Sequence, residues 1–213
     1  MTRSLWTKEL EEDRRWIWLL GMATLPAVVL VIRPIKFAAN PETGEKEKVT
    51  LGDVFERAYD SPVVVSALLL VTGALLLAPR FIRIKNRKLG WLGALAMGIG
   101  QAIAILPGIS RSGSSITAGL ISGIDPKKAA EFSFLMSIPA IAGAVVFKLD
   151  EFKEKFTSDT MAPYLAGAIS AFVVGILAVA LVMTAIKRGK FQSFAYYCFA
   201  AGISGIIYFS LAS

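Results

Sequence analysis

Apolar residues occur along the chain in long runs that are separated by short charged stretches. Five of these runs approach the ~20 residues that a helix needs to cross a membrane, although the first two are short. The runs are Trp16–Ile32, Pro62–Ala78, Ala130–Phe147, Pro163–Ile186 and Phe194–Ala212. The pattern therefore predicts an all-α polytopic membrane protein with about five transmembrane helices, in which residues 1–213 form a single integral membrane domain.

The segment Leu89–Ile124 is also apolar, but it is interrupted. An apolar, helix-like half, Leu89–Leu106, is followed by Pro107 and Gly108, and a shorter half, Ser114–Ile124, comes after them. About eleven helical residues rise only ~17 Å, which is too little for a hydrocarbon core of ~30 Å. The second half therefore cannot cross the membrane by itself.

Lysine and arginine residues concentrate in two short loops, which the positive-inside tendency places in the cytoplasm. The chain leaves the cytoplasm after the first loop and returns at the second, so it crosses an even number of times between them. Two predicted spans already lie there, so segment 89–124 crosses twice or not at all. We favour a re-entrant helix-turn-helix, because irregular backbone at membrane depth requires surrounding protein or a polar cavity. The loop cations are Arg80, Arg83, Lys85, Arg87 and Lys88, then Lys187, Arg188 and Lys190.

Composition supports the membrane assignment and excludes several kinds of chemistry. Apolar residues make up 55% of the chain and charged residues 18%, and the mean hydropathy is +0.61. The net charge of +7 comes from the short loops, so it does not indicate a nucleic-acid partner. The chain contains no histidine, which excludes zinc sites of the usual kind, Ser-His-Asp triads and phosphohistidine chemistry within it. The single cysteine, Cys198, cannot form an intrachain disulfide.

The sequence PGISRSG, Pro107–Gly113, is the strongest candidate for a functional site. Its glycines allow backbone amides to approach a ligand, and the helix expected to begin near Ser112–Ser114 presents free N–H groups to an anion. Arg111 adds a planar fork of donors that suits phosphate oxygens. The alternative is a packing turn whose arginine extends to the membrane surface. Because a charge within the membrane is costly, we favour a phosphate site.

At these residues the chain resembles a known family. GQAIAILPGISRSGSSI, followed by EFSFLMSIPAIAGA, is similar to the second half of the undecaprenyl-diphosphate phosphatases, the bacitracin-resistance family. The similarity extends to WIWLLGMATLPAVVL near the beginning and KRGKFQSFAYY near the end. The resemblance implies a multi-pass enzyme of the bacterial plasma membrane. Such an enzyme removes the terminal phosphate of undecaprenyl diphosphate, recycles the lipid carrier for peptidoglycan synthesis and confers bacitracin resistance.

The resemblance also implies an inverted-repeat fold and a set of site residues. Arg111 would bind the diphosphate and stabilise charge during phosphoryl transfer, while Ser110 and Ser112 would donate hydrogen bonds as further catalytic groups. Gln101 would line the same cavity. A divalent metal ion, Mg²⁺ or Ca²⁺, is implied, but its ligands are not evident in this chain. The remaining substrate-binding positions would be Pro107, Gly108, Gly113 and Ser114.

The chain departs from the family pattern in one important respect. The first repeat of the family carries a glutamate-rich segment followed by Pro-Ile-Ser-Ser-Ser-Gly-His, and nothing here matches it. We therefore expect the chain to lack the N-terminal repeat and to hydrolyse its substrate poorly alone. Glu131 is a possible acid, although its proximity to Lys127 and Lys128 favours a solvated or ion-paired role. The alternative function is a non-catalytic membrane protein or subunit that binds polyprenyl phosphates and needs a missing repeat or a homo-oligomer.

Overall fold

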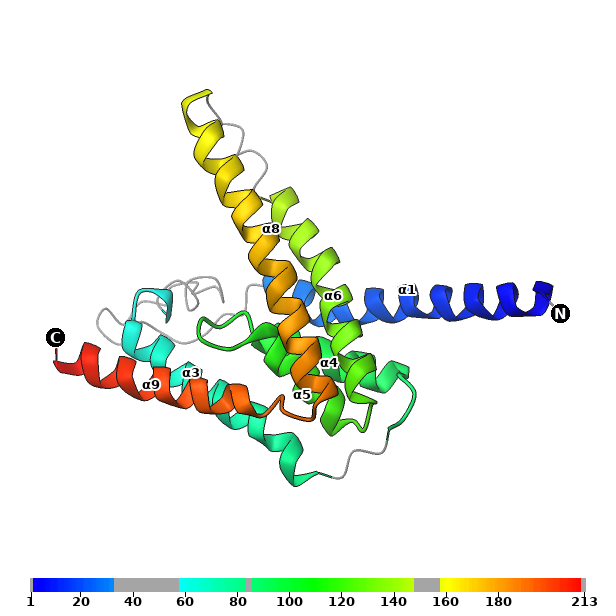
Figure 1. The fold of residues 1–213 in the computed structure, drawn as a ribbon, viewed down its shortest axis with the longest axis horizontal. Helices are drawn as coiled ribbons and strands as arrows, with labels where there is room; N and C mark the ends of the chain where they lie inside the picture. Colours follow the sequence, from blue (N-terminus) through cyan, green and yellow to red (C-terminus); the bar gives the residue numbers. More distant parts are fainter. Residues whose placement is uncertain (1, 33–57, 83–85, 148–157, 212–213) are drawn as a thin grey trace, which may run out of the picture.

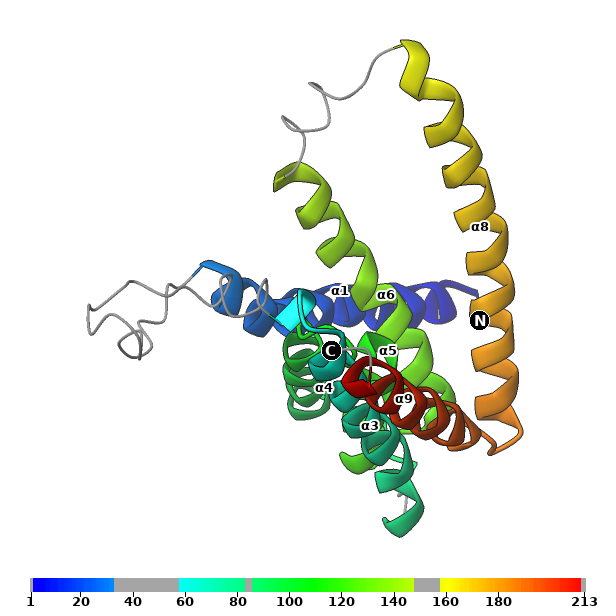
Figure 2. The same ribbon diagram turned by 90° about the vertical axis from the view of Figure 1, so that its left-hand side faces the viewer.

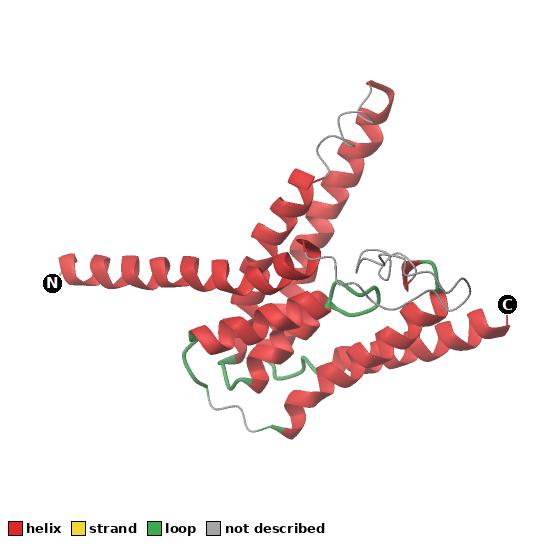
Figure 3. Cartoon of the chain, turned by 180° about the vertical axis from the view of Figure 1, so that it is seen from behind, coloured by secondary structure: helices red, strands yellow, loops and turns green. Residues whose placement is uncertain are grey.

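The structure is a computed structural model that describes residues 2–32, 58–82, 86–147 and 158–211. Within these ranges the chain forms helices (Figures 1 and 3), so the predicted all-α class is confirmed. The helices are α1 (Thr2–Ile32), α3 (Pro62–Leu77), α4 (Trp91–Ile103), α5 (Arg111–Ile121), α6 (Pro126–Phe147), α8 (Ser158–Lys187) and α9 (Ser193–Leu211), and a 3₁₀ turn, η1 (Ala78–Phe81), extends α3.

Three stretches of helix in the described ranges are long and apolar enough to cross a membrane: Pro62–Phe81, Met161–Lys187 and Ser193–Leu211. The helices expected at Trp16–Ile32 and Ala130–Phe147 form within α1 and α6. Two polar stretches lie outside the described residues. They are residues 33–57, which form most of a loop predicted over Arg33–Ser61, and KLDEFKEKF at 148–156, for which a surface helix is predicted.

α3 and α9 lie side by side and run in opposite directions (Figure 1). Small residues allow this close approach, as is common between membrane helices. A Cβ atom on Gly202 of α9 would lie 2.5 Å from Leu70 Cδ2 of α3, and one on Gly73 would lie 2.9 Å from the Phe199 ring. The glycines at this contact are therefore required by packing.

The buried core lies where α4 and α5 meet α1 and α6. Gly98 of α4 touches the backbone of Ala23 in α1 so closely that a Cβ atom would overlap the Ala23 carbonyl oxygen. Between α1 and α6, the rings of Trp16 and Phe132 meet edge to face with centroids 5.6 Å apart. Gly98 thus serves close helix packing.

α8 has a different environment from the other helices. Figure 2 shows it standing away from them over most of its length, and only 6% of its apolar window is buried. Side chains from Met161 to Leu181 are exposed on every face of the helix. A helix that is apolar on all sides suits contact with lipid or with other transmembrane segments.

Candidate functional site

The candidate site lies at the tip of a helical hairpin formed by α4 and α5. The two helices have thirteen and eleven residues, so they rise only ~20 Å and ~17 Å. At the open end of the hairpin, the Arg87 amide donates to the Gly123 carbonyl at 2.8 Å, and the Asp125 amide donates to the Arg87 carbonyl at 3.4 Å. The chain therefore enters and leaves the hairpin at adjacent points.

Ser110 determines where α5 begins. Its backbone is extended, with φ −69° and ψ 119°, and its hydroxyl oxygen accepts a hydrogen bond from the Gly113 amide at 3.1 Å. This N-cap starts the helix at Arg111, so the expected start near Ser112–Ser114 was late by one to three residues. The Ser114 amide donates to the Ser110 carbonyl, whereas the Arg111 and Ser112 amides have no acceptor among the described residues. Free amides at a helix N-terminus favour an anion.

Arg111 is oriented by Gln101 of α4. The Arg111 Nε–H donates to Gln101 Oε1 at 3.0 Å, and the Gln101 side chain is only 4% exposed. The terminal guanidinium nitrogens have no hydrogen-bond partner in the described part of the chain, so they can donate to two oxygens of one phosphate. Gln101 Nε2 is buried and also has no partner there. The structure thus brings together two residues that the sequence suggested, ten positions apart.

Thr72 of α3 forms hydrogen bonds to the backbone of the Pro107–Gly113 turn. Thr72 was not identified from the sequence as a site residue. Its hydroxyl donates to the Gly108 carbonyl at 2.8 Å and accepts from the Ser110 amide at 3.0 Å. Gly108 has a φ of +90°, and a Cβ atom there would overlap the Val65 carbonyl oxygen of α3. The sequence does show a hydroxyl-bearing residue within the apolar run LLLVTGALLL, which could have marked Thr72 as a polar contact. The sequence does not show which segment the hydroxyl contacts.

The other expected site residues are divided between the turn and the packing of the hairpin. Ser112 is half-buried in the first turn of α5. Ser114 is buried at the contact between α5 and α4. The two helices are so close there that a Cβ atom on Gly100 would lie 2.8 Å from the Ser114 carbonyl oxygen. Pro107 and Gly113 are buried as well, so their contribution is to the packing of the turn. Gly100, like Gly98, therefore serves close helix packing.

A second hydroxyl contact joins α5 to α6. Ser115 Oγ donates to the Arg111 carbonyl at 2.8 Å and shares a hydrogen bond with Ser133 Oγ. Both serines are buried. The backbone of Arg111 is thereby connected to α6, while Thr72 connects Ser110 to α3.

The residues around the turn do not fit a divalent cation. They provide a guanidinium, amide groups and neutral hydroxyls, whereas Mg²⁺ and Ca²⁺ prefer carboxylates. Asp125 follows α5 at its far end and accepts from the Lys128 amide at 3.1 Å. Glu131 is half-buried, and its carboxylate lies 3.7 Å from the Lys127 ammonium, which is the ion pair expected. No group of three potential metal-ligating residues occurs within the described ranges.

Comparison with known proteins identifies the family. The chain is 41% identical over 156 residues to the undecaprenyl-diphosphatase of Desulforapulum autotrophicum, covering 70% of this chain and 55% of that protein. It is 34% identical over 209 residues to that of Syntrophotalea carbinolica, covering 97% and 72%, and 37% identical over 197 residues to that of Rhodopirellula baltica, covering 90% and 70%.

The match to the first of these relatives spans little more than half of that protein's length. Residues 1–204 match the family model described as bacitracin resistance protein BacA. The matched range includes the PGISRSG turn and the helical hairpin that carries it. The chain belongs to the bacitracin resistance protein BacA family.

Proposed function

We propose that the chain binds the diphosphate of undecaprenyl diphosphate at the turn Pro107–Gly113 and removes its terminal phosphate. The product, undecaprenyl phosphate, is the lipid carrier for peptidoglycan synthesis. The relatives that carry the name undecaprenyl-diphosphatase support this proposal. The observation that carries it furthest is the Arg111–Gln101 hydrogen bond, because it fixes the guanidinium at Nε and leaves its terminal nitrogens for the phosphate.

The proposed reaction depends on the placement of the turn within the bacterial plasma membrane. We infer that segment 89–124 is re-entrant: it dips in from the cytoplasm and returns there, without crossing. The short helices support this inference, and so do the hydrogen bonds between Arg87 and residues 123–125. In this arrangement Arg111 lies at membrane depth, where a phosphate attached to a lipid can reach it.

The residues of the turn have distinct tasks in this proposal. Phosphoryl transfer places negative charge on the nonbridging oxygens, and catalysis consists largely of positioning and charge stabilisation. Arg111 donates to two of these oxygens, and the free amides of Arg111 and Ser112 provide donors at the helix N-terminus. The Ser112 hydroxyl donates, and the Ser110 hydroxyl can donate while its oxygen accepts from Gly113. These groups together form the anion-binding side of the reaction.

A second candidate function is binding without turnover. It is favoured by one observation: the turn Pro107–Gly113 itself supplies a cation and neutral groups but no carboxylate to act as a general base. In this case the chain would hold polyprenyl phosphates as a binding protein or as a subunit. The two functions share the same turn and differ only in phosphate release.

Phosphate release and lipid binding by the purified chain will separate these functions. The chain is reconstituted in nanodiscs with undecaprenyl diphosphate, and the Arg111→Lys variant is compared with Arg80→Lys, an exposed cation in η1. We expect Arg111→Lys to reduce turnover more than ten-fold, or more than ~1.4 kcal/mol, because lysine lacks the planar donor fork. Arg80→Lys should behave like the wild type.

Each result has a defined meaning. Binding that requires Arg111, without phosphate release above background, would support the binding function. Equal turnover in wild type and Arg111→Lys would refute the assigned role of the guanidinium. Absence of both binding and release would refute both functions of the turn.

A further inference from the structure

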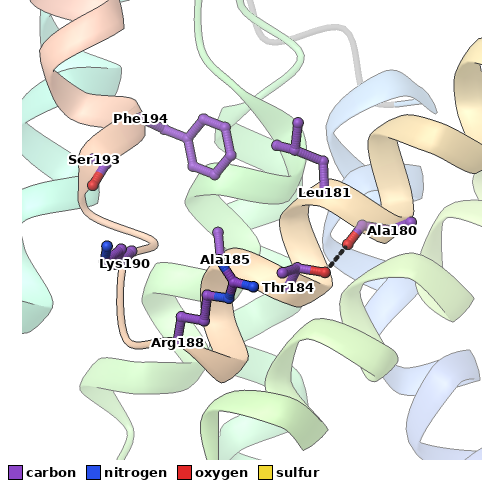
Figure 4. Close-up of a pocket in the computed structure, with 8 residues that line it drawn as sticks. All are labelled: Ala180, Leu181, Thr184, Ala185, Arg188, Lys190, Ser193 and Phe194. Atoms are coloured by element: carbon purple, nitrogen blue, oxygen red, sulfur yellow. Dashed lines mark hydrogen bonds between the residues drawn. The ribbon is translucent and has the colours of Figure 1, made fainter.

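A pocket lies where α8 turns into α9, away from the Pro107–Gly113 turn. Its volume is about 490 Å³. Figure 4 shows the Phe194 ring and the Leu181 side chain facing one another across it, with Ala185 below the ring. Arg188 and Lys190 line its other end, along the connection between the helices. The pocket therefore has an apolar part and a cationic part.

The backbone fixes the two cations on either side of a tight turn. The Lys190 amide donates to the Ala185 carbonyl at 2.8 Å, and the Gly189 amide donates to the Ile186 carbonyl at 3.0 Å. These are the two hydrogen bonds of a Schellman motif, and Gly189 has the positive φ, +65°, that the motif requires. The turn thus presents Arg188 and Lys190 to the same pocket.

No acidic residue balances these cations in the nearby sequence. The chain contains no aspartate or glutamate after Asp159, while Lys187, Arg188 and Lys190 lie within four positions. The ion pair recorded in the described ranges joins Lys127 to Glu131, and neither Arg188 nor Lys190 is paired with a carboxylate there. The cationic part of the pocket is therefore available to an anion.

The position of the pocket suggests the chemical class of that anion. Met161–Lys187 and Ser193–Leu211 are both long and apolar enough to cross a membrane. Where two consecutive helices cross, the connection between them lies at the membrane–water interface. The apolar part of the pocket then faces the hydrocarbon, and the cations face the headgroups. Basic pockets between transmembrane helices on the cytoplasmic side bind anionic lipid headgroups.

We propose that this pocket binds an anionic glycerophospholipid of the bilayer. The lipid phosphate contacts Arg188 and Lys190, and one acyl chain lies against Leu181 and Phe194. A zwitterionic lipid of the same chain length fits the apolar part but carries no net charge for the two cations. The proposal does not depend on phosphatase activity, because the pocket contains no residue of the Pro107–Gly113 turn.

Lipid binding to the full chain tests the proposal directly. The delipidated chain is titrated in detergent with phosphatidylglycerol or phosphatidylcholine, and bound lipid is measured by native mass spectrometry and by the shift in Tm. We expect phosphatidylglycerol to bind at least ten-fold more tightly. The double variant Arg188→Gln/Lys190→Gln should lose this preference. The matched control Arg80→Gln/Arg87→Gln, which removes two exposed cations outside the pocket, should retain it.

A further variant separates a defined site from general attraction to a charged surface. Thr184 lines the pocket and is exposed, so Thr184→Phe fills the space without burying a large side chain in the core. We expect this variant to bind phosphatidylglycerol at least five-fold more weakly although every cation is present. Unchanged binding, or equal losses in the two double variants, would overturn the site. Displacement by glycerol phosphate alone, or preferential displacement by undecaprenyl phosphate, would overturn the choice of a bilayer phospholipid.

Discussion

Replacing Thr72 with valine should loosen the contact between α3 and the PGISRSG turn. Thr72 is 1% exposed, and valine has nearly the same shape, so the change leaves no cavity. It removes the hydrogen bonds to the Gly108 carbonyl and from the Ser110 amide. Side-chain hydrogen bonds between membrane helices contribute ~0.6 kcal/mol on average and ~1.7 kcal/mol at most. We therefore expect the free energy of unfolding to fall by ~1–3 kcal/mol.

Reversible unfolding in mixed micelles with increasing SDS measures this loss. Thr72→Ser keeps the hydroxyl and should recover most of it. Thr24→Val is the matched control, because the Thr24 hydroxyl donates only to the Leu20 and Gly21 carbonyls of its own helix, at 2.9 and 2.8 Å. The control should lose less than ~0.5 kcal/mol. Equal stability of Thr72→Val and wild type, with unchanged binding of undecaprenyl diphosphate, would refute the role assigned to Thr72.

Two further predictions concern the turn and its topology. Gly108→Ala should lower the free energy of unfolding by more than ~1 kcal/mol in the same assay, because alanine is strained at positive φ and its methyl group would overlap α3. Gly90→Ala is the control and should differ little from wild type, because no atom lies within 4 Å of a Cβ placed at Gly90. Single cysteines at positions 88 and 127, replacing Lys88 and Lys127 in a Cys198→Ala background, should both react with an impermeant maleimide from the cytoplasm, and labelling from opposite faces would contradict the re-entrant hairpin.

Most of the helices could be predicted from the sequence, because they contain long apolar runs. The charged first half of α1, residues 2–15, was not predicted because it carries no such run. The start of α5 was predicted too late, since a single hydroxyl, that of Ser110, determines it by accepting from the Gly113 amide. The family resemblance placed Gln101 in the same cavity as Arg111, but their hydrogen bond was not predicted. The antiparallel hairpin explains how residues ten positions apart meet.

The contacts of Thr72 could not be predicted in this way. They join residues that are 36 and 38 positions apart, and local patterns carry no information about such distances. The pocket between α8 and α9 could not be predicted either, because it depends on how two helices are placed in space. The cations at 187, 188 and 190 indicated a cytoplasmic loop, but the apolar wall beside them comes from both helices and depends on the turn at Gly189.

The hydroxyl of Thr72 also has a consequence for biosynthesis. Proteins are made from the N-terminus, so α3 leaves the ribosome before the PGISRSG turn does. In the re-entrant arrangement proposed above, the Gly108 carbonyl and the Ser110 amide then find their partner already in the bilayer, and neither has to enter lipid unsatisfied. Ser133, which joins α5 to α6, is synthesised only afterwards and completes the enclosure. Within that arrangement, the order of the helices along the chain is also a safe order of membrane insertion for this polar turn.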